Sequence, residues 1–262
     1  MSRQLVEKTK DTLFPPGSVA LVTGAAQRIG ADIVRALHAE GLAIALHYRA
    51  SAQAAEELAS ELEATRPDSV ALLQADLLDP AAPRKLVGKI EQRWGQLDVL
   101  VNNASAFYPT PVGEIDAAHW DELMGSNVRA PLFLAQAAAP LLARARGAIV
   151  NLVDIHGMAP LRSHPVYSSA KAALIMLTRS LAIELAPDIR VNAVAPGAIL
   201  PPTGTAALPE GMVEGIPLRR AGSPHDIAQT VVFLARPGSY VTGQVIAVDG
   251  GKSLLGERPT PV

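Results

Sequence analysis

The chain has 262 residues, of which 49% are apolar and 18% charged, a globular composition that excludes a disordered polar chain. Its formal net charge is −2, so the chain has no excess of basic residues that would bind duplex nucleic acid. We therefore expect no nucleic-acid partner. The chain has no cysteine, which excludes disulfides, thiolate nucleophiles and thiolate metal sites.

Residues 1–17 are predicted to be an N-terminal extension. They alternate charged residues with isolated apolar ones and have no continuous apolar core of a signal peptide. No stretch of the chain approaches the roughly 18 apolar residues of a membrane-spanning helix. We therefore expect a cytoplasmic protein without a membrane partner.

From Ser18 onward, short β-branched runs alternate with longer stretches of helical spacing. The predicted strands are Val19–Val22, Ala43–Leu46, Val70–Leu73, Val99–Val101, Ala148–Val153, Val191–Val194 and Val245–Val248. The predicted helices are Arg28–Glu40, Ala52–Thr65, Pro83–Trp94, Trp120–Arg144, Val166–Ala186 and Pro224–Ala235. The strands are almost wholly apolar, as in parallel sheets covered on both faces. The alternation predicts one α/β domain over residues 18–253, with a doubly wound seven-stranded parallel sheet flanked by helices.

Two segments break this alternation. Residues 198–222 are rich in glycine and proline, and a loop of this length in a compact domain is usually functional, so we expect a substrate lid there. Residues 254–262 form a C-terminal tail.

The turn after the first predicted strand has the composition of a phosphate-binding loop. It runs from Gly24 to Gly30 and leads into a helix, so that backbone amides face the carboxyl end of the strand. Gly24 permits the tight turn, and Gly30 permits close packing of the helix on the strand. A plain glycine turn would look the same, so this motif alone leaves the function open.

The end of the second predicted strand favours a phosphorylated dinucleotide. Residues 41–55 contain no acid, whereas a carboxylate there would hold the free ribose 2′-hydroxyl. The position is occupied by His47, Tyr48, Arg49 and Ser51. With Arg28 in the preceding turn, two guanidinium groups are available to a 2′-phosphate, which predicts NADPH. The alternative is two ordinary solvated arginines.

Tyr167 and Lys171 form a candidate proton-transfer pair. They are four residues apart in a predicted helix and so share a face. An ammonium beside a phenol lowers the pKa of the phenol. A Tyr and a Lys at this spacing also occur together by chance. What favours a functional pair here is its position after the fifth strand, at the crevice end of the sheet.

Taken together, these features resemble the short-chain dehydrogenase/reductase family over residues 18–253. The residues that carry the resemblance are Thr23, Gly24, Gly30, Asp76, Asn102, Asn103, Ala104, Asn127, Tyr167, Lys171, Pro196 and Gly197. The resemblance implies a single Rossmann-like domain, a nicotinamide cofactor and a homotetramer. Two predicted helices, Trp120–Arg144 and Val166–Ala186, are apolar around most of their circumference, which supports burial at subunit contacts.

The resemblance also implies roles. Tyr167 is the general acid, Lys171 holds the nicotinamide ribose, and Asn127 supports a water-linked proton path. Asp76 contacts the adenine. The full set of cofactor-binding residues implied is Gly24, Arg28, Ile29, Gly30, His47, Tyr48, Arg49, Ser51, Asp76, Leu77, Asn103, Ala104, Ser105, Tyr167, Lys171, Pro196 and Gly197.

Two positions depart from the common pattern of the family. Typical members have glycine at Arg28, and serine near Asp154, which precedes Tyr167 by 13 residues. An ionised carboxylate at Asp154 would repel a developing alkoxide, which disfavours simple ketone reduction. A carboxyl group suits a nitrogen heterocycle better, because it accepts N–H bonds or relays a proton to a ring nitrogen.

Both departures, with the segments Asn102–Pro111 and His47–Arg49, resemble the pteridine reductase branch. The resemblance implies a pterin ring stacked between Phe107 and the nicotinamide. The implied substrate-binding residues are Arg28, Ser105, Phe107, Asp154 and Tyr167. The plainer alternatives are that Phe107 anchors a loop and that Asp154 is a turn residue.

The sequence thus predicts an NADPH-dependent reductase of pterins or folates, which converts dihydrobiopterin, dihydromonapterin or dihydrofolate to its tetrahydro form. The first alternative is a carbonyl or 3-oxoacyl-thioester reductase. The second is an NADPH-sensing binding protein, against which Tyr167, Lys171 and Asn127 argue, since a sensor has no need of proton-transfer groups. The other histidines lack metal-ligand spacing, so no metal is expected.

Overall fold

The computed structural model describes residues 13–201 and 211–255. The N-terminal extension, the lid and the tail therefore lie partly outside the described residues. Within those residues, no helix is both long and apolar enough to cross a membrane.

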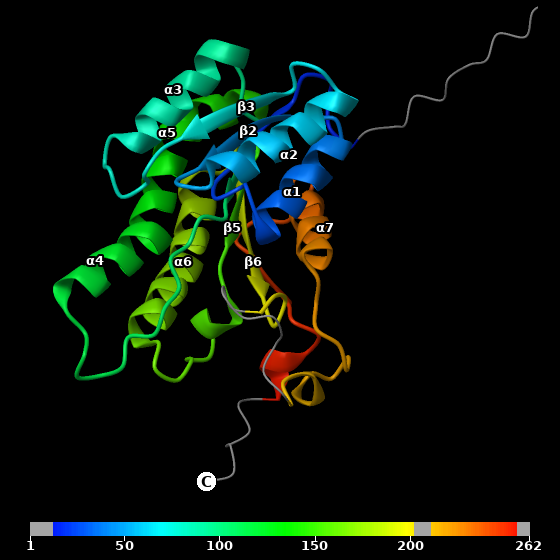
Figure 1. The fold of residues 1–262 in the computed structure, drawn as a ribbon. Helices are drawn as coiled ribbons and strands as arrows, with labels where there is room; N and C mark the ends of the chain where they lie inside the picture. Colours follow the sequence, from blue (N-terminus) through cyan, green and yellow to red (C-terminus); the bar gives the residue numbers. More distant parts are fainter. Residues whose placement is uncertain (1–12, 202–210, 256–262) are drawn as a thin grey trace, which may run out of the picture.

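Seven parallel strands form one sheet in the order β3-β2-β1-β4-β5-β6-β7 (Figure 1). The strands are β1 Val19–Val22, β2 Ala43–Tyr48, β3 Val70–Gln74, β4 Val99–Asn102, β5 Ala148–Leu152, β6 Arg190–Pro196 and β7 Val245–Val248. The helices are α1 Arg28–Ala39, α2 Ala52–Thr65, α3 Ala82–Trp94, α4 Ala117–Met124, α5 Ala130–Ala145, α6 Pro165–Glu184 and α7 Pro224–Ala235. The predicted single-domain, Rossmann-like, doubly wound sheet is confirmed.

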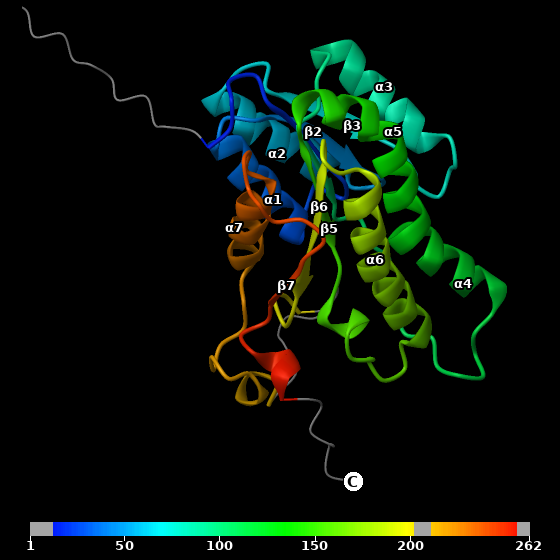
Figure 2. The ribbon, with the colours of Figure 1, turned by 180° about the vertical axis from the view of Figure 1, so that it is seen from behind.

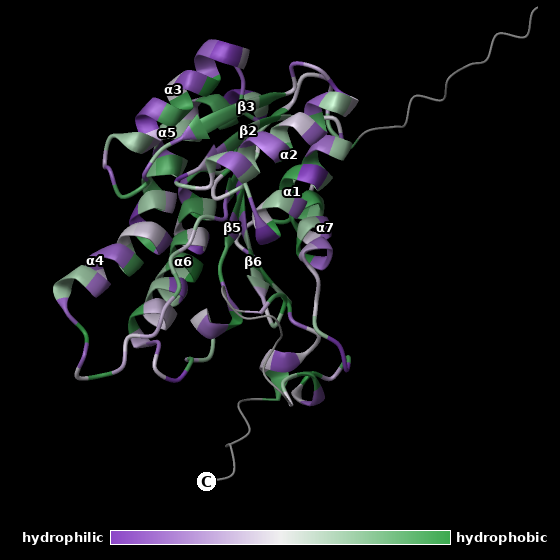
Figure 3. Cartoon of the chain, viewed as in Figure 1, coloured by the Kyte–Doolittle hydropathy of each residue, from purple (hydrophilic) through white to green (hydrophobic). Residues whose placement is uncertain are grey.

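Helices cover both faces of the sheet, which explains why its strands are apolar on both sides. Helices α1, α2 and α7 lie on one face (Figure 1), and α3, α5 and α6 lie on the other (Figure 2). Colouring by hydropathy shows the strands as largely hydrophobic and the helices as mixed (Figure 3). In α1, Ile33, Val34 and Leu37 are fully buried at helical spacing. Each such side chain contributes about 1.5–3 kcal/mol through burial.

The structure corrects one predicted helix. The stretch expected as a single helix over Trp120–Arg144 begins earlier, at Ala117, and contains a π-helical turn, Gly125–Arg129, between α4 and α5. The Asp116 carboxylate accepts a hydrogen bond from His119 N at 2.8 Å and caps the start of α4. The wide turn, with the sequence GSNVR, has Val128 as its one strongly apolar residue, so hydropathy does not show where the helix widens.

Strand boundaries also differ from those predicted. Strand β2 continues to Tyr48, and β6 runs from Arg190 to Pro196, whereas β5 ends at Leu152 and leaves Val153 outside. The polar ends of β2 and β6 are held by backbone pairing with their neighbours, such as Tyr48 with Gln74 in β3. Hydropathy alone does not detect such pairing.

The strand order places a crevice at one end of the sheet. Strand β1 lies between β2 and β4, so the chain connections leave β1 and β4 in opposite directions. Ligands of open α/β sheets bind outside the carboxyl ends of the strands at such a point. The turns after β1, β4 and β5 therefore surround the candidate site.

Candidate active site

The turn after β1 is tightly packed against the segment after β4. The Asn103 amide donates to the carbonyl oxygens of Thr23 and Gly24 at 2.8 and 2.9 Å. A Cβ at Gly24, whose φ is +59°, would lie 3.0 Å from Ala104 Cα, and one at Gly30 would lie 2.3 Å from Gly24 O. Glycine is therefore required at both positions, as the motif predicts.

The start of α1 presents backbone amides that fit an anionic group. The side chain of the N-cap residue Gln27 makes no capping hydrogen bond within the described part of the chain. The first turn of the helix contains no Asp or Glu. The first amides of a helix lack partners within the helix and carry a partial positive charge. This donor set suits the pyrophosphate of a dinucleotide.

Arg28 extends from this turn to the start of the lid. Its backbone has a φ of +55°, a region that L side chains rarely adopt. Its guanidinium Nη2 donates to the carbonyl of Pro201 at 2.8 Å. The exposed cation thus lies between the glycine turn and the predicted lid segment.

The four polar residues at the end of β2 divide into two pairs. His47 is only 2% exposed, and Tyr48 packs against the apolar core. Arg49 is exposed, and Ser51, at the start of α2, is half-buried. The ring nitrogens of His47 contact the backbone of the neighbouring segments, so Arg49 and Ser51 are the better placed of the four for a phosphate.

The remaining predicted cofactor residues lie at the ends of β3 and β6. Asp76 is exposed after β3, and its carboxylate accepts from Leu78 N at 2.9 Å, while Leu77 is buried. Gly197 N donates to Val248 O at 3.0 Å directly after Pro196. Ile29, in the first turn of α1, packs against the core.

Tyr167, Asp154 and Lys171 lie together in the structure. The Tyr167 hydroxyl donates to Asp154 Oδ2 at 2.8 Å. Lys171 Nζ donates to Leu152 O at 2.9 Å and lies 5.7 Å from the centroid of the Tyr167 ring. The second oxygen of Asp154 accepts from His156 N at 2.8 Å, so this residue also caps the short helix Ile155–Gly157.

The direction of the pKa shift of Tyr167 differs from the sequence-based expectation. Burial, together with the Asp154 carboxylate, raises the pKa of the phenol above its ordinary value of 10.0. Burial lowers the pKa of Lys171 to about 8, and the Asp154 charge opposes this shift. The net shift is thus opposite to the lowering expected from Lys171 alone, because burial and the Asp154 carboxylate both raise the pKa of the phenol. Tyr167 therefore holds its proton and is arranged as a donor.

Asn127 lies in the π-helical turn and holds the segment after β4. It is fully buried, and its amide donates to Ala106 O at 3.0 Å and Leu123 O at 2.9 Å. Ser105 Oγ donates to Asn127 Oδ1 at 2.7 Å. These contacts fix the backbone immediately before Phe107.

Phe107 places an aromatic ring beside the proton donor. It lies edge-on to Tyr167 with ring centroids 4.8 Å apart, and it is 49% exposed. It also stacks on His164, at 4.9 Å and an interplanar angle of 12°. The sequence indicated no role for His164, which is the N-cap residue of α6 and precedes Tyr167 by three residues.

The described part of the predicted lid packs against the segment after β7 and the start of α7. Leu218 N donates to Gly250 O at 3.1 Å, and Arg220 pairs with Asp226 at 3.0 Å. A pocket of about 420 Å³ lies between these segments. Residues 202–210 of the predicted lid lie outside the described residues.

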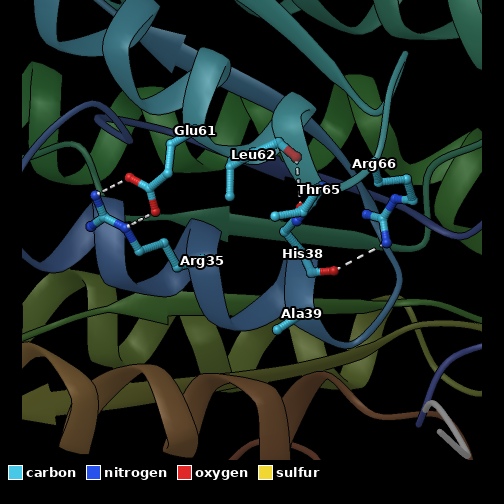
Figure 4. Close-up of a pocket in the computed structure, with 7 residues that line it drawn as sticks. All are labelled: Arg35, His38, Ala39, Glu61, Leu62, Thr65 and Arg66. Atoms are coloured by element: carbon cyan, nitrogen blue, oxygen red, sulfur yellow. Dashed lines mark hydrogen bonds and ion pairs between the residues drawn. The ribbon is translucent and has the colours of Figure 1, made fainter.

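A larger pocket, of about 490 Å³, lies between α1 and α2 and is separate from this site (Figure 4). Arg35 makes two hydrogen bonds with the Glu61 carboxylate, at 2.8 and 2.7 Å. Arg66 donates to the carbonyl oxygens of His38 and Leu42. Because these arginines already bond to other groups of the protein, the pocket has fewer free hydrogen-bond donors for a ligand than the crevice has. Among the described residues, no group of three or more His, Asp or Glu side chains could hold a metal.

The chain is similar in sequence to known reductases. The model of a family described as Enoyl-(Acyl carrier protein) reductase matches residues 24–253. Pteridine reductase 1 of Leishmania tarentolae is 41% identical, over 93% of this chain and 99% of the relative. A 3-oxoacyl-(acyl-carrier-protein) reductase of Staphylococcus aureus strain Mu50 is 39% identical, over 88% of this chain and 96% of the relative.

The family-model match extends over strands β2 to β7, the glycine turn and the Tyr167–Lys171 helix. These matches show an oxidoreductase, of a family whose reductases use a nicotinamide cofactor. The chain belongs to the short-chain dehydrogenase/reductase family.

Proposed function

We propose that the protein is an NADPH-dependent reductase of pterins or folates, with a dihydropterin or dihydrofolate as substrate and the tetrahydro form as product. The observation that carries this proposal is the 2.8 Å hydrogen bond from the Tyr167 hydroxyl to the Asp154 carboxylate, with Phe107 edge-on to the same phenol. A proton donor, a carboxylate and a flat apolar surface suit a planar nitrogen heterocycle.

Each residue has a separate task in this reaction. The nicotinamide, when bound, supplies the hydride. Phe107 and the backbone fixed by Ser105 and Asn127 orient the flat ring of the substrate. Asp154 accepts an N–H bond from the ring, and Tyr167 donates the proton. The buried Lys171 ammonium lies close enough to the phenol to offset the negative charge that proton donation leaves.

A second candidate function is reduction of a carbonyl or 3-oxoacyl thioester. It is favoured by the 39% identity to the 3-oxoacyl-(acyl-carrier-protein) reductase. The Asp154 carboxylate disfavours it, because carbonyl reduction places negative charge on the substrate oxygen. Oxidation of NADPH with dihydrobiopterin, dihydrofolate and an acetoacetyl thioester, each offered separately, distinguishes the two. Turnover of the thioester alone would overturn the pterin proposal.

We expect the protein to bind NADPH at least about tenfold more tightly than NADH, because Arg28 and Arg49 are cations beside the predicted 2′-phosphate position. Tenfold corresponds to about 1.4 kcal/mol, which one charge-assisted hydrogen bond supplies. Titration of each cofactor measures the ratio. Arg49→Gln should reduce it, whereas Arg84→Gln, at an exposed position on α3, should not. Equal affinities for the two cofactors in the parent protein would contradict the assignment.

We also propose a homotetramer, as the family resemblance implies. Phe133 on α5 and Met176 and Ile183 on α6 are 40%, 58% and 78% exposed. Met176 and Ile183 are seven residues apart and share a face of α6. Light scattering at micromolar concentration should give four times the 27.4 kDa mass of the chain. A monomeric mass would refute this state, and Ile183→Glu should lower the mass if α6 is part of the contact.

A further inference from the structure

His47 connects three segments of the cofactor crevice through its side chain. Ring Nδ1 lies 3.1 Å from Gly24 N, and ring Nε2 lies 3.2 Å from Ala75 O. A backbone N–H only donates and a carbonyl only accepts, so the two partners require a neutral imidazole with its proton on Nε2. The bonds are compatible with one tautomer alone.

The main chain reinforces this connection. Ala25 N donates to His47 O at 2.8 Å, and Ala75 N donates to Tyr48 O at 3.1 Å. The turn after β1, the end of β2 and the segment after β3 are thereby held together. The same three segments carry Gly24, Arg49 and Asp76, which belong to the predicted cofactor-binding set.

We propose that His47 is the positioning residue of the cofactor crevice: its neutral ring holds the Gly24 amide and the Ala75 carbonyl in the arrangement that binds the dinucleotide. A proton added at Nδ1 would turn an acceptor into a donor that faces the Gly24 N–H. The turn would then have to move, and cofactor affinity would fall. This inference rests on the proposed use of NADPH, but it does not depend on the substrate.

The surroundings of His47 favour its neutral form. Burial lowers the pKa of the imidazole below its ordinary value of 6.5, against the opposing effects of the Ala75 carbonyl and the Asp76 carboxylate. The other titratable groups on the adjoining segments are Arg28 in the turn, and Tyr48 and Arg49 beside His47. The folded protein therefore binds this proton less readily than the unfolded chain. The contribution of the neutral His47 ring to the free energy of unfolding is complete above the ordinary imidazole pKa of 6.5. It is lost as the pH falls below that value.

Two substitutions separate the two bonds of the ring. In His47→Asn, the amide oxygen can occupy the place of Nδ1 and accept from Gly24 N–H. In His47→Gln, the amide nitrogen can reach the place of Nε2 and donate to the Ala75 carbonyl. Neither side chain titrates between about pH 5 and about pH 8. His225→Asn, at an exposed position in α7, is the matched control.

The dissociation constant of NADPH, measured by fluorescence titration over that pH range, is the readout. At about pH 8 we expect His47→Asn to bind within about threefold of the parent and His47→Gln to bind at least about tenfold more weakly. The phosphate of NADPH also titrates near pH 6, but equally for every variant. Affinity of the parent and the control should fall more steeply with decreasing pH than affinity of His47→Asn. Identical pH profiles for the parent and His47→Asn, or equal affinities of the Asn and Gln variants, would overturn the proposal.

A measurement on the unsubstituted protein covers the case in which a variant does not fold. Nitrogen NMR of the His47 ring, without cofactor, should show a protonated Nε2 and an unprotonated Nδ1. NADPH should then lower the pKa of His47, because binding and the Nδ1 proton exclude each other. A proton on Nδ1 of the neutral ring, or an unchanged pKa, would reject the inference. Failure of the parent to reduce any pterin would reject the proposed substrate and leave this result intact.

Discussion

Tyr167→Phe should lower turnover by about 10²–10⁴-fold while it leaves the affinity for NADPH within a few-fold. The change deletes one hydroxyl group, the group that donates to Asp154, and preserves the ring that contacts Phe107. Steady-state oxidation of NADPH and a separate cofactor titration measure the two effects.

The control for this substitution is Tyr240→Phe, which deletes a hydroxyl from a fully exposed tyrosine. It should leave both measurements unchanged. A Tyr167→Phe protein that retained more than half of the parental rate would show that Tyr167 is not the general acid.

Asp154→Ser should have opposite effects on the two candidate substrates. With a pterin, turnover should be lost, because serine supplies neither the carboxylate for a ring N–H nor the same proton relay. With a ketone or thioester, activity should rise, because a hydroxyl donor replaces a charge that repels the developing alkoxide. The change should appear mainly in kcat, since Phe107 still offers its ring to the flat substrate.

The second role of Asp154, as the cap of Ile155–Gly157, is expected to survive this substitution, because serine is also a good N-cap. Asp116→Ser makes the same exchange at the N-cap of α4, away from the site. It measures how much this exchange alone lowers the free energy of unfolding. Unchanged pterin reduction by Asp154→Ser would identify Asp154 as a turn residue only. The proposed substrate would then depend on Arg28 and Phe107.

The sheet was predictable because its strands are buried on both faces. Val19–Val22 is apolar throughout, and Ala148–Leu152 is apolar except for the buried Asn151; burial imposes that pattern on any sequence that forms the fold. Gly24 and Gly30 were predictable for a related reason, because other backbone atoms occupy the space that a Cβ would need at both positions. Motif spacing likewise placed Tyr167 and Lys171 on one face of α6.

What could not be predicted depends on contacts between distant segments. The inward orientation of His47 follows from its bonds to Gly24 and Ala75, 23 and 28 residues away in the chain. The raised pKa of Tyr167 depends on the depth of its burial, which spacing does not give. The stack of Phe107 on His164 joins a loop to the start of α6. None of these contacts leaves a periodic signal in the sequence.

The backbone of Arg28 has an evolutionary consequence. A side chain in the left-handed region costs about 1–2 kcal/mol relative to glycine, in a fold whose whole stability is of the order of 5–15 kcal/mol. Selection for stability alone would therefore favour glycine at this position, which is the residue that typical members of the family have. A lineage that keeps arginine there gives up part of its tolerance to destabilising mutations elsewhere. The arginine would persist only as long as the protein needs its cation. Once that need ends, position 28 would be among the first to mutate back to glycine.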